Sequence, residues 1–347
     1  MRHRLINANL LIIAATAGIA VSTLEAQSSS PDHRATRIEP GESWMDDRGL
    51  PIQAHGGGIL RVGETFFWFG EDRSPENDPE KRYVACYSSK DLVRWTFRRQ
   101  ALQLSDPEQL GKLWVVERPK VFHNAKTGKF VMYFHLDAPG PDGHGYTFGR
   151  VGIATSDTVD GDYRYLKSFR PLGKESRDIG QFVDDDGSPY LIFESRPTGG
   201  FFIASLTDDY LSADKQVAFI HAPLEGGALV HYHGMYYVTG SHLTGWNPNP
   251  NVYATAASLA GPWTEFKDIA PSETNTYDSQ STALLKVAGR KATTVIYMGD
   301  RWKPKALWDS RYIWMPLVID GPLLRLPPPA PWKIDVVRGT ATVEPTP

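Results

Sequence analysis

The sequence contains a single cysteine, Cys86, among its 347 residues, so no disulfide can form within the chain. Stability must therefore come from burial of apolar side chains, which a domain of about 300 residues can supply. The 37 basic and 40 acidic residues give a formal net charge of −3 and form no long block of either sign. This balance gives no electrostatic case for nucleic acid or an anionic membrane surface as a partner.

Long apolar runs and helical periodicity are scarce as well. The extended apolar stretch 10–21 is short for a membrane span and follows a basic start at 1–4. Residues 1–26 therefore indicate a cleavable secretory signal peptide, with an uncleaved anchor as the alternative, and predict a secreted or periplasmic protein. The serine-rich 27–36 is expected to be a disordered leader, and the proline-rich 327–347 a tail packed on or over the folded domain.

A short pattern recurs five times between residues 37 and 326: a turn glycine followed by an aromatic and β-branched strand. The copies lie at 63–69, 128–134, 187–193, 234–238 and, more loosely, 289–298. In the first four units a small-residue strand, a polar turn and then a Trp or Tyr follow. A unit of about 50–60 residues with several strands is typical of a β-propeller. The repeat predicts an all-β, five-bladed propeller of four-stranded antiparallel blades, as one domain spanning 37–326.

A hydrogen-bonding side chain precedes each aromatic strand at an equivalent position of the repeat. These side chains are His55, Glu117, Asp178, Glu225 and Gln280. Because the first strand of every propeller blade lines one central channel, we expect them to meet in a shared cavity. Carboxyl groups that close cannot all ionise freely, so at least one should have a raised pKa. An acid and a base with separated pKa values are what glycosidic cleavage needs; the alternative is that these residues only satisfy strand ends.

Other candidate sites give weaker signals. The run 184–187 resembles the start of a calcium loop but lacks the later ligands, so it is interpreted as a hairpin turn. His231 and His233 alternate on a strand without a third ligand nearby in the sequence, and are interpreted as surface or rim residues. No Gly-x-Ser-x-Gly motif supports a serine nucleophile. The sequence therefore predicts no metal and no cofactor.

The pocket phrases are similar to those of glycoside hydrolase family 43, and within it to the exo-β-1,3-galactanase group. The run Arg-Asp-Ile-Gly-Gln-Phe-Val-Asp-Asp-Asp-Gly-Ser-Pro-Tyr-Leu at 177–191 resembles the third-blade motif of that family. The other phrases that carry the resemblance lie at 54–58, 68–71, 117–121, 244–249, 278–282 and 297–302. The resemblance covers nearly all of the chain after its N-terminal segment and implies a five-bladed propeller with an inverting active site at its centre.

The resemblance also implies roles for individual residues. Glu225 matches the general acid, although Gly226-Gly227 follows it where the family usually has Ala-Pro. Asp178 matches the aspartate that holds the sugar and tunes the pKa of the acid, and Glu117 a glutamate that binds sugar hydroxyls near the reacting carbon. The further substrate-binding candidates are Glu71, His55, Gln53, Thr244, Trp246, Asn247, Arg301 and Trp302. Trp246 and Trp302 suit stacking on a sugar face, and equally suit packing between blades.

The base is the open point. Most of the family has a blade-one aspartate as general base, and this chain has Gln53-Ala54-His55 there, as the galactanase group does. The resemblance implies that Gln280 acts as the base through its imidic acid tautomer. An ordinary amide nitrogen is not basic, so the alternative is that Gln280 positions water and Glu117 takes the proton.

Together these features predict a secreted, monomeric, inverting glycosidase, with an exo-β-1,3-galactanase acting on the galactan backbone of arabinogalactan as the leading function. The alternatives are an α-L-arabinofuranosidase or β-galactosidase of the same family, or a propeller that binds carbohydrate without cleaving it. The expected partner is a polysaccharide or oligosaccharide, with no nucleic acid and no membrane span.

Overall fold

Five antiparallel sheets follow one another in a computed structural model of the chain, which describes residues 35–344. Blade one contains β1 (His55–Val62), β2 (Thr65–Glu71), β3 (Lys81–Ser89) and β4 (Thr96–Ser105). Blade two contains β5 (Val115–Asn124), β6 (Lys129–Asp137), β7 (Arg150–Ser156) and β8 (Arg164–Phe169). Blade three contains β9 (Ile179–Val183), β10 (Pro189–Ser195), β11 (Gly200–Leu206) and β12 (Ala213–His221). Blade four contains β13 (Leu224–Tyr232), β14 (Met235–His242), β15 (Asn251–Ala256) and β16 (Lys267–Asp268), and blade five β17 (Gln280–Ala288), β18 (Thr293–Arg301) and β19 (Arg311–Pro316).

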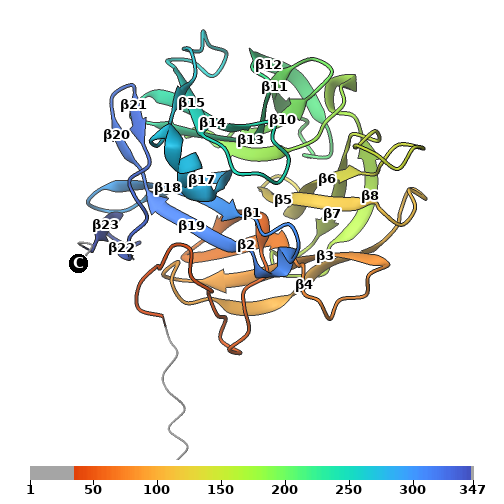
Figure 1. Cartoon of the computed structure of the whole chain (residues 1–347), viewed down its shortest axis with the longest axis horizontal. Helices are drawn as coiled ribbons and strands as arrows, with labels where there is room; N and C mark the ends of the chain where they lie inside the picture. The colour runs from red at the N-terminus through yellow and green to blue at the C-terminus, as the bar shows by residue number, and fades with distance from the viewer. Residues whose placement is uncertain (1–34, 345–347) are drawn as a thin grey trace, which may run out of the picture. The chain divides into compact units, whose positions relative to one another are not determined.

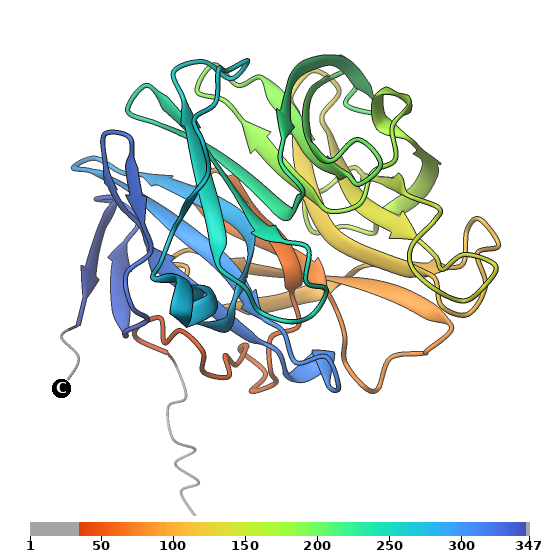
Figure 2. The same cartoon turned by 45° about the horizontal axis from the view of Figure 1, so that its top comes forward.

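The blades form a ring in chain order, and the inner strands β1, β5, β13 and β17 lie around its middle (Figure 1). The tilted view shows the segment before β1, in red, beside the dark blue hairpins near the C-terminus (Figure 2). The predicted five-bladed β-propeller is confirmed. The predicted signal peptide, 1–26, and most of the predicted leader, 27–36, lie outside the described residues.

The aromatic strand of each repeat is the second strand of a blade and is buried on both faces. In β6, every residue from Phe130 to Asp137 is buried, because a neighbouring blade covers each side of the sheet. Such a strand is a continuous apolar run without polar alternation. By contrast, the outer strand β8 keeps only Ser168 buried.

The repeated glycine forms the turn between the first two strands in four blades. Gly63, Gly128, Gly187 and Gly234 have φ between +60° and +85°, a conformation that L-residues with a side chain rarely adopt. Gly289 in the looser fifth copy has another reason to be glycine: a Cβ there would lie 2.1 Å from the backbone nitrogen of Gly339. The segment 184–188 is the hairpin turn between β9 and β10, as predicted.

Blade five has three strands in its sheet, and the described segments 38–41 and 332–343 pack against it. The Gly41 N–H donates to the Tyr312 carbonyl of β19 at 2.8 Å, and Ile38 forms a bridge with Trp332. Residues 332–343 form a hairpin of β22 (Trp332–Asp335) and β23 (Thr340–Val343), and the Trp332 indole is buried. A second hairpin, β20 (Val318–Asp320) with β21 (Leu323–Arg325), precedes it.

Aromatic side chains fill the seam between blades five and one. Trp68 contacts Trp44, Trp95, Tyr312 and Trp314, with ring centroids 4.6–6.2 Å apart. Such aromatic pairs contribute beyond the area they bury, so this seam stabilises ring closure without a disulfide. The remaining elements are short turns: η1 (Pro171–Gly173), η2 (Ser272–Thr274), α1 (Asn275–Asp278) and η3 (Leu307–Asp309). Within residues 35–344, no helix has the length and apolar character needed to cross a membrane.

Candidate active site

A cavity of roughly 400 Å³ opens at the centre of the ring and is lined by side chains from all five blades. Four of the five repeat-equivalent residues line it: Glu117, Asp178, Glu225 and Gln280. The fifth, His55, is fully buried and does not line the cavity; its Nδ1 lies 3.0 Å from Asp300 Oδ1, and its ring stacks on Tyr312. The polar groups of four blades are therefore brought together, and the histidine supports them from outside.

The strand register explains why these positions point inward. Glu117 pairs with His135 across blade two, Glu225 with Ser241 across blade four, and the same pairing recurs for His55 with Glu71 and Gln280 with Asp300. Each pairing is followed within two residues by a register shift, a β-bulge. Bulges bend a strand and redirect side chains, and they are common next to active sites.

Carboxylates from adjacent blades hold the bulges. The Arg118 N–H donates to Glu71 Oε1 at 2.9 Å, and the Gly226 N–H to Asp178 Oδ2 at 2.9 Å. Gly226 has φ +65°, and Arg118 has φ +51°, an unusual conformation for a residue with a side chain. Such local strain persists only where the surroundings impose it, as these two bonds do.

Arg118 connects three blades at the floor of the cavity. Its Nε lies 2.9 Å from Asp178 Oδ2, and its Nη2 donates to Gln280 Oε1 at 2.6 Å. The side chain is 4% exposed, so its charge acts on both partners with little screening by water. Burial tends to raise the pKa of Asp178, but the Arg118 charge brings it below its ordinary value.

Gln280 uses all four hydrogen-bonding positions of an ordinary amide. Its Oε1 accepts from Arg118 and from the Trp302 indole N–H at 2.9 Å. Its Nε2 donates to Glu225 Oε1 and to Ser241 Oγ, both at 3.0 Å. In the imidic acid tautomer the oxygen would carry a proton, so one of its two donors would first have to withdraw.

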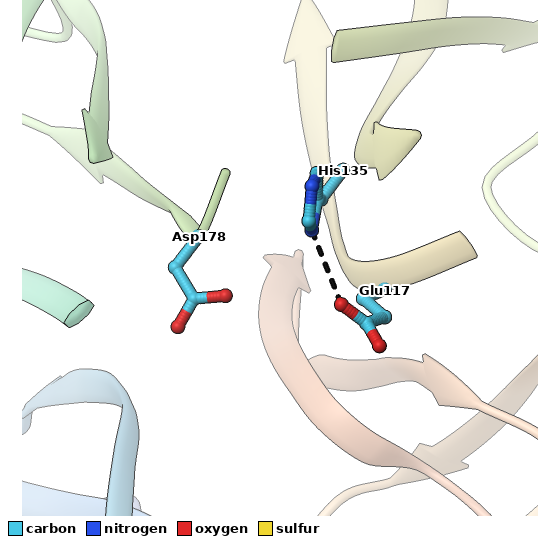
Figure 3. A group of neighbouring side chains, drawn as sticks. All are labelled: Glu117, His135 and Asp178. Carbon is cyan, nitrogen blue, oxygen red and sulfur yellow. Dashed lines mark hydrogen bonds and ion pairs between the residues drawn. The ribbon is translucent and has the colours of Figure 1, made fainter. Parts of the chain in front are cut away.

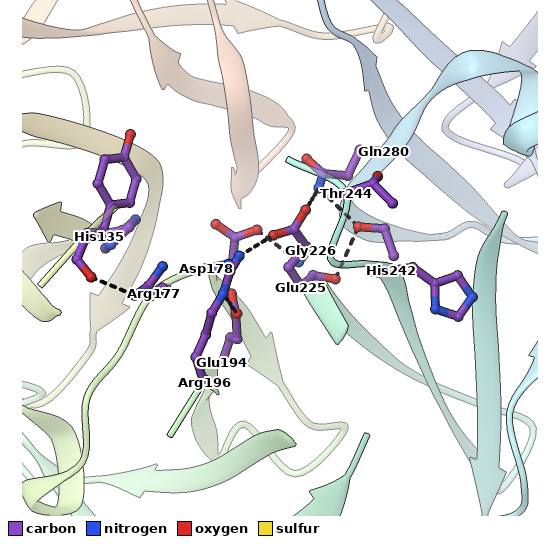
Figure 4. Close-up of polar contacts among 12 residues, drawn as sticks. His135, Arg177, Asp178, Glu194, Arg196, Glu225, Gly226, His242, Thr244 and Gln280 are labelled. Carbon is purple, nitrogen blue, oxygen red and sulfur yellow. Dashed lines mark hydrogen bonds and ion pairs between the residues drawn. The ribbon is translucent and has the colours of Figure 1, made fainter. Parts of the chain in front are cut away.

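The pKa of the Glu225 carboxyl is raised, as are those of Glu71 and Glu194 among the lining residues. For Glu225, burial is the main cause, and the charges of Asp178 and Glu194 add to it, raising the pKa to about 8. The Arg196 guanidinium, whose Nη2 lies 2.6 Å from Glu225 Oε2, opposes this rise (Figure 4). A carboxyl group with such a pKa can hold a proton near neutral pH and donate it.

Glu117 lies on the other side of Asp178 and behaves in the opposite way. Its Oε2 lies 3.1 Å from His135 Nδ1 (Figure 3). On the other side of the ring, His135 Nε2 lies 2.9 Å from Asp137 Oδ2. Burial favours neutral imidazole, but the two carboxylates raise the pKa of His135 to about 10. Burial would also raise the pKa of Glu117, yet the His135 hydrogen bond and charge lower it. Glu117 is therefore an ionised carboxylate near neutral pH.

Three groups of side chains have spacing that a metal ion could use. One of them, Asp178 with Glu194 and Glu225, is already paired with Arg118 and Arg196. Ligand atoms of Glu117, His135 and Asp178 lie within 4.8 Å of one another, but protein partners already engage all three. The predicted rim residue His231 meets Asp184 and Asp185, and there the Lys286 ammonium pairs with Asp185. Sequence reasoning missed the cluster around His231, because Asp184 and Asp185 precede His231 by 46 residues or more and lie on the neighbouring blade.

The predicted substrate-binding residues are divided between the cavity and its surroundings. Glu71, Trp246 and Trp302 line the cavity, and the two indoles meet edge to face at 5.2 Å. Thr244 and Asn247 are exposed on the same loop as Trp246. The remaining predicted residues, Gln53 and Arg301 as well as His55, do not line the cavity: Gln53 Nε2 donates to the Trp308 carbonyl and Arg301 to the Tyr277 carbonyl. Their predicted contact with sugar stays a prediction.

Several lining residues were not predicted from the sequence: Arg118, His135, Tyr146, Arg177, Glu194 and Arg196. Two of them occupy an equivalent position at the end of a second strand, where His135 pairs with Glu117 and the Glu194 N–H donates to the Asp178 carbonyl. Aligning the second strands as well as the first would have found both. Tyr146 lies on a long loop outside the repeat, and its hydroxyl donates to Glu117 Oε1 at 3.2 Å.

The cavity thus combines a protonated carboxyl, ionised carboxylates and exposed indole faces. One group can protonate a leaving oxygen, another can accept a proton from water, and indoles suit the faces of sugar rings. On a five-bladed propeller this arrangement defines a glycoside hydrolase.

Comparisons with known proteins identify the family. The model for glycosyl hydrolases family 43 matches residues 53–302. The chain is similar to a variant exo-β-1,3-galactanase from Phanerochaete chrysosporium solved with β-1,3-galactotriose, with 42% identity, a TM-score of 0.81, and coverage of 89% of this chain and 70% of that one. It is also similar to an exo-β-1,3-galactanase from Clostridium thermocellum, with 36% identity, a TM-score of 0.79, and coverage of 89% and 68%. A search of curated proteins found no match. The chain belongs to glycoside hydrolase family 43, whose members generally act with inversion.

Proposed function

We propose that this glycosidase is a secreted exo-β-1,3-galactanase that acts on the galactan backbone of arabinogalactan. The observation that carries the proposal is the contact between Glu225 and Gln280, 3.0 Å apart, in a pocket that lacks a blade-one aspartate. Similarity to two exo-β-1,3-galactanases supports the choice of substrate. The basic and apolar pattern of 1–26 supports secretion.

Glu225 acts as the general acid in this mechanism. It delivers its proton to the glycosidic oxygen while water attacks the anomeric carbon from the opposite face of the ring. Burial supplies the raised pKa that keeps the proton on Glu225 until the bond breaks. Asp178, held ionised by Arg118, maintains that raised pKa and offers an acceptor for a sugar hydroxyl.

Two assignments of the base are compatible with the contacts. Gln280 would need to release Arg118 or Trp302 from its oxygen before the imidic acid tautomer can form. Glu117 needs no tautomer, but His135 lowers its pKa and so weakens it as a base. Gln280→Ala and Glu117→Gln separate the two. If Gln280→Ala loses nearly all activity and added anions do not restore it, the base is Gln280 in its imidic acid tautomer. If azide restores activity to Glu117→Gln, the base is the Glu117 carboxylate.

The substrate is tested by incubating the enzyme with β-1,3-, β-1,4- and β-1,6-linked galactans and identifying the sugar released. We expect galactose from the β-1,3-linked polymer alone. Release from an arabinofuranoside or from a β-galactoside side chain instead would favour another specificity of the family. Binding without release of any sugar would mean a carbohydrate-binding propeller.

Export is tested separately. Expression of the full chain with a C-terminal tag should yield a shortened protein outside the cytoplasm. A protein of full length retained in the membrane would indicate an uncleaved anchor.

A further inference from the structure

Arg196 lies between two carboxylates at the rim of the cavity. It follows β10 in the turn that leads to β11, and its Nε donates to Glu194 Oε1 at 2.6 Å while its Nη2 donates to Glu225 Oε2 at 2.6 Å (Figure 4). The Arg196 side chain is 36% exposed, whereas the Glu194 and Glu225 side chains are 2% and 8% exposed. Of the three groups, the arginine therefore has the most room to move.

In this arrangement neither oxygen of Glu225 is free to act as an acid. Oε2 accepts from Arg196, and Oε1 accepts from the Gln280 amide. An arginine carries only donors and keeps its charge in proteins, so Oε2 cannot present a proton toward it. A general acid must direct its proton at the leaving oxygen, which requires that Arg196 first withdraws from Glu225.

Glu194 offers the place to which Arg196 can withdraw. Its Oε2 is buried and has no hydrogen-bond partner among residues 35–344. A buried acceptor without a donor is costly, and a guanidinium fits a carboxylate best through two parallel hydrogen bonds. Because Arg196 already contacts Glu194 Oε1, a rotation near the end of its side chain exchanges the Glu225 contact for Glu194 Oε2.

We propose that Arg196 is a positioning residue with two partners. It occupies Glu225 Oε2 in the empty pocket and withdraws onto Glu194 when the sugar on the leaving-group side enters, so that Glu225 can direct its proton at the leaving oxygen only with substrate bound. This inference rests on the proposed function. One proton enters at Glu225 before bond cleavage, and one leaves the base after it, so each turnover is balanced.

The charges around Glu225 make the exchange measurable. The charges of Asp178 and Glu194 in blade three raise the pKa of Glu225. Arg196, also in blade three, and Arg118 in blade two lower it. Arg118 is held in place by its ion pair with Asp178 at 2.9 Å and by its hydrogen bond to Gln280. Arg196 is therefore the cation whose position can change the protonation of Glu225.

The test compares pH profiles of kcat/KM, which reports the free enzyme, and of kcat, which reports the substrate complex. In the wild type, we expect the alkaline limb of kcat to lie at higher pH than that of kcat/KM. Arg196→Gln should raise the kcat/KM limb by about one pH unit and leave the kcat limb in place. Glu194→Gln should lower the kcat limb, because Arg196 loses its second partner. Coincident limbs in the wild type, or equal shifts of both limbs in Arg196→Gln, would overturn the proposal.

Two controls complete the test. Arg98→Gln removes an exposed arginine with an ion pair of 2.7 Å to Asp160 on another part of the ring and should change neither limb. If Arg196→Gln does not fold, Arg196→Lys keeps the positive charge but lacks the two directed N–H groups that reach Glu194 and Glu225. It should leave the pH of the alkaline kcat/KM limb unchanged and lower kcat.

A titration without substrate separates this inference from the proposed function. Carbon-13 NMR of glutamate carboxyls in the free enzyme should show a higher pKa for Glu225 in Arg196→Gln than in the wild type. An unchanged pKa overturns the arginine exchange even if the enzyme cleaves β-1,3-galactan. A shifted pKa in a protein that cleaves no galactan leaves the contact intact and refutes only the substrate.

Discussion

Replacing Glu225 with glutamine should stabilise the protein in a pH-dependent way while removing its activity. Below its unfolded pKa of about 4.5, the carboxyl is protonated in both folded and unfolded chains, so it costs nothing. Above its folded pKa of about 8, it is ionised in both, and the full cost of holding the charge is present. The free energy of unfolding of the wild type therefore falls as pH rises from about 4.5 to about 8. A glutamine at this position does not titrate, so its contribution does not change with pH.

The size of the effect follows from the shift. A change from 4.5 to about 8 corresponds to roughly 5 kcal/mol at about 1.4 kcal/mol per unit. Arg196 loses a partner in Glu225→Gln, which offsets part of the gain. We therefore expect a net stabilisation on the order of 2 kcal/mol at pH 8.5, which vanishes near pH 4.

Urea unfolding followed by tryptophan fluorescence and by circular dichroism, at pH 4, 6 and 8.5, measures the difference. Glu64→Gln, in an exposed turn of blade one, is the matched control and should show no pH-dependent difference. A stability difference between wild type and Glu225→Gln that is constant with pH, or largest at pH 4, would refute the reasoning.

Three further changes test the geometry. Gly226→Ala should lose most activity and about 1 kcal/mol of stability, because φ is +65° and the new Cβ would lie 3.0 Å from a backbone oxygen. Gly234→Ala is the control: its φ is +76° but the space around it is open, so it should lose stability and keep its activity. Trp302→Phe keeps an aromatic face but removes the donor to Gln280, so kcat in a galactan assay should fall about tenfold with little change in KM. Burial lowers the pKa of Lys120 to about 7, so stability rises with pH between about 7 and 10.5; thermal melts of Lys120→Met should lack that rise, and a retained rise contradicts the assignment.

The repeat was sufficient to predict the propeller because the blades share the same turn and strand pattern. A turn glycine with positive φ, as at Gly128, is followed by a strand buried on both faces, and both features are visible in one sequence. The departures come from contacts between distant segments. Gly289 is small because residue 339 approaches it, and segments 38–41 and 332–343, which lie outside the repeat, pack against blade five.

The site was predictable where the repeat determines it. Glu117, Asp178, Glu225 and Gln280 meet because they occupy one position relative to the inner strands. Arg196 was not predictable, because it extends from a turn and its partners depend on where a long side chain reaches. The support of His55 by Asp300 likewise depends on pairing between blades one and five, which the repeat does not encode.

The central claim is that Glu225 protonates the leaving group of a β-1,3-linked galactoside in an inverting reaction. Proton NMR during the first minutes of β-1,3-galactotriose hydrolysis tests it most directly. The account predicts that the wild type releases galactose first as the α-anomer and that Glu225→Gln binds the trisaccharide but releases none. Initial release of the β-anomer, or a wild-type rate in Glu225→Gln, would contradict it.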